Sequence, residues 1–303
     1  MVDVQLARLG SVRARVVSIL DEEYPANLKR IYDPPPFLFV RGSLDDRDAV
    51  SIAIVGTRSP TPYGIEIAGR FAAEIVAAGI PVVSGLARGI DTVAHRSAVN
   101  RDGRTLAVIG SGVDVIYPPE NSRLAEGIIA AGAVLSEFDM GAKPDAGNFP
   151  RRNRIISGIA LATVIIETAI DGGAMITARA ALDQDRDVFA VPGPARAGVR
   201  SGTHLLIRQG NALLVESVQE VLDDLAPRLR GFVPATSLPP PRPAPTLSLF
   251  ERQLYEVLGQ TPIHIDQIAG LAGCTSADTL VHLLSLEFKG VVRQIPGKMF
   301  ARI

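Results

Sequence analysis

The sequence predicts an α/β protein with one large, mainly parallel sheet, followed by a small helical domain. From residue 51 onward, short apolar runs alternate with segments of helical spacing, which is the pattern of βαβ units. Near the end, three helical patterns and a hairpin follow a proline-rich stretch. The fold class is therefore an extended Rossmann-like parallel or mixed sheet with helices on both faces, plus a small C-terminal winged-helix domain.

The strands of the expected sheet are short and are bounded by Gly, Ser or Pro. The chain is 47% hydrophobic and has no Trp, and its apolar residues are mainly Ala, Val, Ile and Leu, which suits parallel strands buried under helices. Helical segments between the strands include 65–78 and 174–182. Such sheets bind ligands at the carboxyl ends of their strands. The predicted strands are 52–55, 80–83, 106–109, 134–135, 164–166, 188–191 and 213–215.

Composition divides the chain into four parts. Residues 1–50 form an N-terminal lead-in segment, expected to be irregular apart from one short strand, and residues 51–225 form the Rossmann-like domain. Residues 226–249 contain seven prolines and predict a semi-rigid linker. Residues 250–303 predict a winged helix-turn-helix domain, with two short helices, a third opened by Thr275 and Asp278 as a capping box, and a hairpin.

The charge and cysteine content limit the classes of partner. The net charge is −1, so any nucleic-acid site must be a local basic patch. Cys274 is the single cysteine, which excludes an internal disulfide and favours a reducing compartment. No apolar run reaches the ~18 residues of a membrane helix, and the start lacks a signal-peptide pattern. We therefore expect a cytoplasmic protein with no membrane association.

The loop after the first Rossmann strand has the features of an anion site. Gly56-Thr57-Arg58-Ser59 combines backbone N–H groups at a helix start with a guanidinium, which favours an anion site over a structural turn by about two to one. The Gly-x-Gly-x-x-Gly fingerprint is absent, and no acidic residue closes the second strand. NAD and FAD binding is therefore not expected, and no cofactor is predicted.

Glycines also follow the second, third and fifth strands, where they permit close approach of a ligand to the backbone. After the second and fifth strands, a tight structural connection is an equally good explanation. Asp91 and His95 lie one helical turn apart, a spacing more typical of a surface pair than of a catalytic dyad. The candidate anion-loop residues are Gly85 with Arg88, Gly110 with Gly112, and Gly172 with Gly173.

The most informative stretch is Phe149-Pro150-Arg151-Arg152-Asn153-Arg154. Guanidinium forks bind phosphates, a Phe ring offers a face for base stacking, and an Asn side chain can hydrogen-bond a base edge. Acidic residues are scarce around this cluster. We favour a nucleic acid or another polyanion over a solvated charged face by about three to one.

Catalytic machinery is not recognisable in the sequence. The four histidines, at 95, 204, 264 and 282, show no metal-ligand spacing, so no metal is predicted. There is no Gly-x-Ser-x-Gly elbow, no Walker A loop and no evident pair of acid/base carboxylates. We therefore expect a protein that is not an enzyme.

Six motifs follow one another along the chain: Gly-Thr-Arg-Ser, Ser-Gly-Leu-Ala-Arg-Gly-Ile-Asp, Gly-Ser-Gly-Val-Asp, Phe-Pro-Arg-Arg-Asn-Arg, Glu-Thr-x-x-x-Gly-Gly and Phe-Ala-Val-Pro-Gly. In this order they resemble the bacterial DNA-processing protein A (DprA/Smf) family over roughly residues 24–225. The resemblance implies a homodimer that binds and protects incoming single-stranded DNA during natural transformation and helps to load the recombinase RecA. Many members carry a helical domain before the Rossmann domain, for which residues 1–50 leave no room.

The resemblance also implies roles for particular residues. The region around His204 and Leu213 corresponds to the part of the fold that the family uses for self-association. Lys143, in the loop before the arginine cluster, is a looser match to the DNA site. The DNA contacts carried over motif by motif are Arg58, Phe149, Arg152, Asn153 and Arg154.

Two other functions remain open. The first is a nucleotide-processing enzyme of the lysine-decarboxylase-like Rossmann group, because Glu167 with Gly172-Gly173 weakly echoes its Pro-Gly-Gly-x-Gly-Thr-x-x-x-Glu signature. The echo lacks the third Gly-Thr step and the trailing Glu. The second is a transcription factor that binds DNA through the winged helix, but residues 246–303 contain five basic and five acidic side chains. A net charge of zero does not favour autonomous DNA binding.

Overall fold

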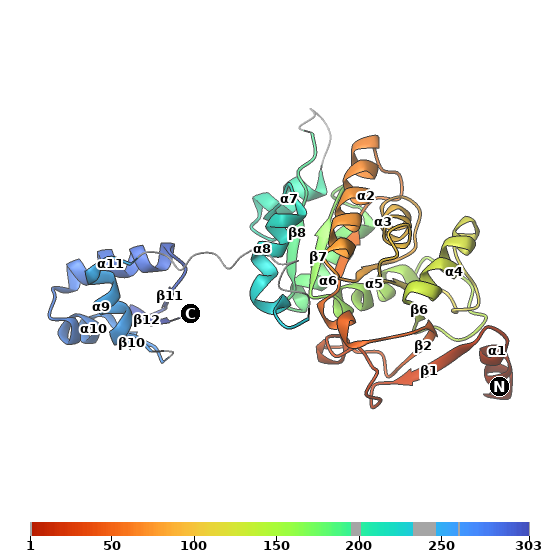
Figure 1. Ribbon diagram of the computed structural model, residues 1–303, viewed down its shortest axis with the longest axis horizontal. Helices are drawn as coiled ribbons and strands as arrows, with labels where there is room; N and C mark the ends of the chain where they lie inside the picture. The colour runs from red at the N-terminus through yellow and green to blue at the C-terminus, as the bar shows by residue number, and fades with distance from the viewer. Residues whose placement is uncertain (1, 195–200, 233–246, 260, 303) are drawn as a thin grey trace. The chain divides into compact units, whose positions relative to one another are not determined.

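The computed structural model describes residues 2–194, 201–232, 247–259 and 261–302. The chain divides into two compact units, residues 1–240 and residues 241–303. The first unit is built on a nine-stranded sheet with the order β1-β2-β6-β5-β4-β3-β7-β8-β9 (Figure 1). The strands are β1 (Ala14–Ser18), β2 (Phe37–Gly42), β3 (Ile52–Val55), β4 (Val82–Ser84), β5 (Thr105–Val108), β6 (Ala133–Ser136), β7 (Ala162–Ile165), β8 (Asp187–Ala190) and β9 (Leu213–Leu214).

The strands from β3 to β9 run parallel to one another, whereas β2 pairs antiparallel with both β6 and β1 at one end of the sheet. Alternate residues of β3 enter different cores: Ile52 and Ile54 pack under one face, and Ala53 and Val55 under the other. Because both faces of the strand are buried, its sequence is continuously apolar. The predicted fold class, a mixed Rossmann-like sheet, is confirmed.

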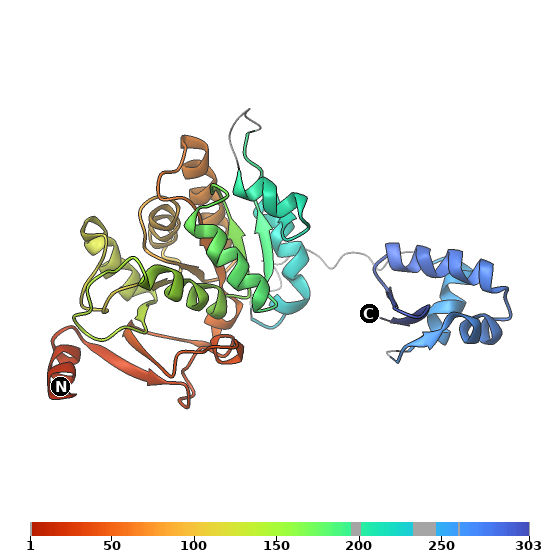
Figure 2. The same ribbon diagram turned by 180° about the vertical axis from the view of Figure 1, so that it is seen from behind.

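Helices cover both faces of the sheet. The cores show α2, α3, α4 and α8 on one face and α5, α6 and α7 on the other. Figure 1 has α2, α3 and α8 in front, and Figure 2 has α5 and α6 in front. The helices of this unit are α1 (Val2–Ser11), α2 (Pro62–Ala77), α3 (Ile90–Val99), α4 (Ser122–Ala131), α5 (Asn148–Ile159), α6 (Gly173–Asp183), α7 (Gly202–Arg208) and α8 (Val218–Leu229), with 3-10 turns at Leu28–Arg30, Asp46–Val50 and Pro119–Asn121.

The expectation of an irregular lead-in with one strand is wrong. Residues 2–50 form α1, β1 and β2, and they belong to the first compact unit. Val17, Leu38 and Val40 are fully buried because the β1–β2 pair extends the sheet beyond β6. At the other end, α8 runs to Leu229, so the first residues of the predicted linker are helical, and residues 233–246 lie outside the described residues.

The second unit is a winged helix, as predicted. Its three-stranded sheet has the order β10-β12-β11, and Leu254, Ile268, Leu283 and Phe300 are in its core. Thr275 caps the third helix by accepting a hydrogen bond from the Asp278 N–H (3.2 Å). The elements are α9 (Leu249–Val257), β10 (Ile263–His264), α10 (Ile265–Ala272), α11 (Ser276–Phe288), β11 (Val292–Ile295) and β12 (Met299–Arg302).

The strand order creates a crevice at the carboxyl ends of β3 and β7. The chain proceeds outward from β3 through β4 and β5 to β6, and then crosses back to β7 on the other side of β3. The connections that leave β3 and β7 therefore diverge, which is the arrangement that opens a ligand-binding crevice in α/β sheets. None of the helices in the described part of the chain has the length and apolar character needed to cross a membrane.

Candidate nucleic-acid interface

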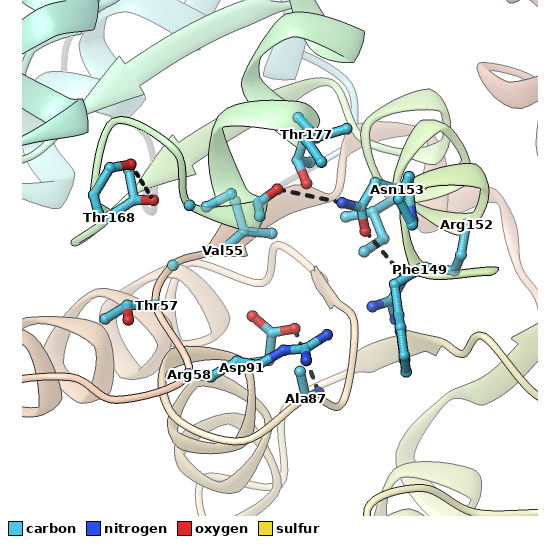
Figure 3. A pocket seen from close by; sticks show the side chains of 18 of the residues that line it. Val55, Thr57, Arg58, Ala87, Asp91, Phe149, Arg152, Asn153, Thr168 and Thr177 are labelled. Carbon is cyan, nitrogen blue, oxygen red and sulfur yellow. Dashed lines mark hydrogen bonds between the residues drawn. The ribbon is translucent and has the colours of Figure 1, made fainter. Parts of the chain in front are cut away.

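A cavity of about 470 Å³ lies at this crevice. It is lined by the loop after β3, the connection from β4 to α3, the first turns of α5 and the start of α6. In Figure 3, Thr57 and Thr168 lie on one side of the cavity, Phe149 and Arg152 on the other, and Arg58 and Asp91 between them. The structure thus brings together four of the motifs that were widely separated in the sequence.

The Gly-Thr-Arg loop is held in place on both sides. The Thr57 N–H donates to the Glu167 carbonyl oxygen (2.6 Å), and the Ile90 N–H donates to the Thr57 carbonyl oxygen (3.2 Å). A Cβ at Gly56 would lie 2.5 Å from Cγ1 of Ile90, so a larger residue does not fit. The loop is therefore fixed between β7 and α3, and it leaves the Arg58 side chain exposed.

Arg58, Phe149, Tyr117 and Arg88 form a row of alternating chemistry, called here the Arg58–Arg88 row. The Arg58 guanidinium carbon lies 4.8 Å from the Phe149 ring centroid, and the Arg88 guanidinium carbon lies 6.0 Å from the Tyr117 ring centroid. The two ring centroids are 6.1 Å apart. All four side chains line one further pocket beside the larger cavity. Two aromatic faces between two cations are suited to bases and phosphates of a flexible strand.

Sequence reasoning missed Tyr117 in this row. Tyr117 follows β5, whereas Phe149 is on α5, and only the strand order places the two rings side by side. The available signal was an aromatic residue immediately after a glycine loop at a strand end, followed by Pro118 and Pro119.

Arg88 is paired with a carboxylate. Its Nε donates to Oε1 of Glu120 (2.5 Å), and both side chains are more than half exposed. This hydrogen bond raises the pKa of Arg88 and lowers the pKa of Glu120. One cation of the row is therefore already partly neutralised before any phosphate binds.

Arg152 requires a correction. It was predicted to grip phosphate from the surface, but it is only 4% exposed. Its guanidinium donates to the Gly85 carbonyl oxygen (2.6 Å), to the Val108 carbonyl oxygen and to Oδ1 of Asn153 (3.2 Å). Burial lowers its pKa to about 10, against the raising effect of Asp91. Arg152 remains charged at neutral pH and joins the ends of two strands from inside the protein.

The other members of the arginine cluster have separate environments. Arg154 is mostly buried and forms ion pairs with Asp33 (3.3 Å) and Glu137 (2.6 Å). The expectation that its guanidinium is exposed and binds a phosphate is therefore wrong. Asn153 is buried and donates to the Gly173 carbonyl oxygen (3.4 Å). Arg151 is exposed.

Lys143 is exposed in the loop between β6 and α5. Like Arg151, it therefore stays a predicted DNA contact.

Most of the glycine loops that were candidates for anion binding serve packing instead. The N–H groups of Gly85, Gly112 and Gly172 donate to Asp91 (3.2 Å), to the Ala142 carbonyl oxygen (2.9 Å) and to the Ala169 carbonyl oxygen (3.0 Å). Because these N–H groups have protein partners, the tight structural connection is the better explanation at these three positions.

The remaining loop positions differ from one another. Ser59 donates its N–H to Oγ1 of Thr57 (3.2 Å) within the Gly-Thr-Arg turn. A Cβ at Gly110 would lie 3.2 Å from the Phe149 ring, so this glycine makes room for the ring. Gly173 is exposed at the start of α6, and a Cβ there would meet nothing within 4 Å. Of these loop glycines, Gly173 is the one whose surroundings still suit a bound anion.

Asp91 and His95 are both buried, so the expectation of a surface pair is wrong. Asp91 accepts hydrogen bonds from the N–H groups of Gly85 (3.2 Å) and Ala87 (3.4 Å), and burial raises its pKa. Nδ1 of His95 lies 2.8 Å from the Thr105 hydroxyl. Burial lowers the pKa of His95 to about 3, which keeps the ring neutral. Asp91 therefore supports the loop that carries Arg88, and His95 joins α3 to the start of β5.

The residues expected at a dimer interface lie near the free edge of the sheet. β9 is the last strand in the order, and Leu213 on it is 55% exposed. Nε2 of His204 lies 3.0 Å from the Gly193 carbonyl oxygen, which joins α7 to the segment after β8. The described structure does not include a second chain, so self-association stays a prediction.

Comparison with known proteins identifies close relatives. The family model of DNA recombination-mediator protein A matches residues 15–226, and the model of the DprA winged helix domain matches residues 238–298. Protein Smf of Escherichia coli strain K12 is 38% identical over 279 residues, covering 91% of this chain and 74% of that protein. DNA processing protein DprA of Streptococcus pneumoniae is 43% identical over 209 residues, covering 68% of this chain and 72% of that protein.

Two solved structures share the fold of the first unit. The X-ray structure of DprA from Streptococcus pneumoniae superposes with a TM-score of 0.66 at 41% identity, covering 71% of this chain and 76% of that chain. DNA processing protein A from Helicobacter pylori, solved for its single-stranded DNA binding mode, superposes with a TM-score of 0.63 at 28% identity, covering 71% of this chain and 97% of that chain.

Proposed function

This chain belongs to the DNA recombination-mediator protein A family, and from that premise we propose that it binds single-stranded DNA along the Arg58–Arg88 row without altering it chemically. The observation that carries the proposal is the row itself: two rings flanked by two guanidinium groups, next to a cavity at the strand ends. Unpaired bases can stack on such rings, whereas the bases of a duplex are already stacked on each other. The rings therefore favour single strands over duplex DNA.

The finer role follows from the family. We propose that the protein protects incoming single strands during natural transformation and helps to load RecA onto them as a homodimer. Leu213 and Leu214 support the dimer, because they expose apolar side chains on an edge strand that could meet the same strand of a second copy.

The winged helix is less suited to be the main DNA-binding element. Its helix α11 contains no Lys or Arg between residues 276 and 288. Leu280, Val281, Leu284 and Phe288 are instead exposed on this helix. A helix of this composition offers few contacts to phosphates, which supports placing the DNA site on the first unit.

A non-catalytic role is supported by the surroundings of Glu167. Its Oε2 accepts hydrogen bonds from the N–H (3.0 Å) and the hydroxyl (3.1 Å) of Thr61, the residue that caps α2. A carboxylate that holds a helix N-terminus has a structural task. The partial match of Glu167 to the signature of the nucleotide-processing enzymes is therefore explained by this structural role and does not require catalysis.

The test is a salt titration of DNA binding with two variants. Arg58→Ala should weaken single-strand binding and reduce the slope of log affinity against log salt by about 0.7, the value of one lost phosphate contact. Phe149→Leu should weaken binding by about 1–3 kcal/mol, the range for base–aromatic stacking, and leave the slope nearly unchanged. Leu retains apolar bulk beside Gly110, so thermal melting should match the parent.

Equal affinity for single strands and duplex in the parent protein would contradict the proposal. A Phe149→Leu variant that loses the salt slope together with the affinity would show that the ring acts only by holding the loop.

A further inference from the structure

Helix α6 begins at the large cavity with backbone donors that have no partner. Its N-cap residue, Gly172, has no side chain that could accept hydrogen bonds from the first turn. The Gly172 N–H itself donates to the Ala169 carbonyl oxygen (3.0 Å), but the N–H groups of Gly173 and Ala174 donate to no other described residue. Two donors therefore remain available at the positive end of the helix dipole.

Thr177, one turn after Gly173 on α6, is a second and independent indication of a ligand. Its side chain lines the cavity and is only 2% exposed. No hydrogen bond joins its hydroxyl to another described residue. Figure 3 shows Thr177 directed from α6 into the cavity, next to Asn153. A buried hydroxyl without a partner costs free energy, so a bound ligand is the partner for which the structure leaves room.

The cavity has room for such a ligand beside the first turn of α6. Gly173 is exposed, and a Cβ at this position would meet nothing within 4 Å. At the preceding position the backbone is already covered, because a Cβ at Gly172 would lie 2.3 Å from Oγ1 of Thr168. The first turn of α6 is therefore open at Gly173, where the free donors begin.

The charged groups of the lining favour an anion. Arg58 and Arg152 both line the cavity, and their guanidinium carbons lie 4.8 and 5.9 Å from the Phe149 ring centroid. The carboxylate in the described lining, Asp91, already accepts a hydrogen bond from the Gly85 N–H (3.2 Å). Burial raises the pKa of Asp91, and the positive charge of Arg152 opposes this rise. The Asp91 carboxylate is therefore satisfied by protein groups, whereas the donors of α6 are not.

We propose that the start of α6 holds a backbone phosphate of the bound single strand, through the N–H groups of Gly173 and Ala174 and the hydroxyl of Thr177. The inference rests on the proposed function. Arg58 and Phe149 belong both to the row and to the lining of this cavity. A strand with one base stacked on Phe149 therefore brings a neighbouring phosphate to the cavity, where a helix N-terminus can bind it.

The three donors are uncharged, and this separates their contact from that of Arg58. A guanidinium that neutralises a phosphate releases counterions, so its contribution falls as salt rises. Backbone N–H groups and a hydroxyl carry no net charge and contribute affinity with little salt dependence. The phosphate at α6 should therefore account for binding that persists when salt weakens the arginine contacts.

The experiment compares proline with alanine at position 173, in fluorescence anisotropy titrations of the full chain with dT oligonucleotides at several salt concentrations. Gly173→Pro removes one N–H at the first helical position, which proline favours. Gly172 already has φ −70° and ψ 151°, the extended conformation that precedes a proline. Gly173→Pro should weaken binding about tenfold, close to the lower end of the range for one hydrogen bond to a charged group, with an unchanged salt slope. Gly173→Ala keeps the N–H and should bind like the parent.

A second pair of variants tests the hydroxyl in the same titrations. Thr177→Val keeps the branched shape of the side chain and removes the hydroxyl, so it should lose about as much affinity as Gly173→Pro. Thr177→Ser keeps the hydroxyl and should bind more tightly than Thr177→Val.

Parent-like affinity in either Gly173→Pro or Thr177→Val would overturn the inference and leave the proposed function standing. A flatter salt slope in Gly173→Pro would also overturn it, because the variant would then act through Arg58. An equal loss in Gly173→Ala would show that added bulk, and not the missing N–H, weakens binding, which contradicts the inference as well. Failure of the parent to bind dT strands would remove the proposed function itself.

Discussion

Replacing Glu120 by Gln should strengthen single-strand binding. In the structure, Nε of Arg88 donates a hydrogen bond to Oε1 of Glu120 (2.5 Å). The carboxylate is therefore bound to the same guanidinium that lies next to the Tyr117 ring. A phosphate that approaches Arg88 must compete with this carboxylate and is also repelled by it. The variant removes the competitor and keeps the size of the side chain. A gain in binding is a useful outcome because misfolding does not readily produce it.

The magnitude follows from counterion release. A freed Arg88 can make about one additional phosphate contact, which should steepen the salt slope by about 0.7 for single strands. The affinity gain should therefore be greatest at low salt. Between about 50 and about 200 mM salt, the advantage of the variant over the parent should shrink about 2.6-fold, because that is the effect of one such contact over a fourfold change in salt.

The assay is a set of anisotropy titrations with dT oligonucleotides at several salt concentrations. Glu126→Gln is the matched control. Glu126 lies on α4, the helix that follows the 3-10 turn of Glu120, but it pairs with Arg41 (3.0 Å) rather than with Arg88. The control should show a much smaller gain and an unchanged slope. If Glu120→Gln and Glu126→Gln behave alike, the gain reflects only net charge, and the proposed competition at Arg88 is refuted.

Three other predictions concern stability and assembly. Arg152→Met should destabilise the first unit by about 3–5 kcal/mol, since it leaves the buried Gly85 and Val108 carbonyl oxygens without their donor and removes the positive charge near the buried Asp91; a urea unfolding curve equal to the parent's would contradict this. Leu213→Arg should convert a dimer into monomers on light scattering, and a monomeric parent would exclude the interface. Hydrogen bonds from Lys289 first, and then from neighbouring serines and backbone, lower the pKa of Glu251 from 4.5 to about 2. This carboxylate therefore stabilises the winged helix above about pH 4.5, and the contribution is lost as pH falls towards 2; hydrogen exchange of α11 amides should report the loss, and Glu251→Gln should remove this pH dependence.

The sheet was predictable wherever a strand is buried on both faces. Such strands are continuously apolar, and β3 and β8 appear at the expected places for that reason. β1 was not predictable in the same way, because Arg15 interrupts a short segment whose burial depends on pairing with β2. This pairing is a tertiary contact, and local sequence does not report it.

The site was predictable only in its individual parts. Gly-Thr-Arg and Phe149 could be named from residue type and from their positions after predicted strands. The neighbours of Phe149 could not, because Tyr117 and Arg88 reach it through the order of β3, β4 and β5 in the sheet. The Arg88–Glu120 pair was hidden for the same reason, since its members are 32 residues apart.

In the arginine cluster, the position of each residue around helix α5 decides whether its side chain is buried or exposed, and composition alone does not. Ile155, Ile156 and Ile159 form the buried stripe of α5, and Arg152 precedes them by three, four and seven residues, which places it on the same face. Arg151 is rotated by about 100° from Arg152 and is exposed. Identical side chains one residue apart thus have opposite environments, and only the exposed one can exchange its counterions for phosphate. The salt dependence of binding should therefore depend on Arg58, Arg88 and Arg151, while Arg152 acts by holding the loop that presents Arg88.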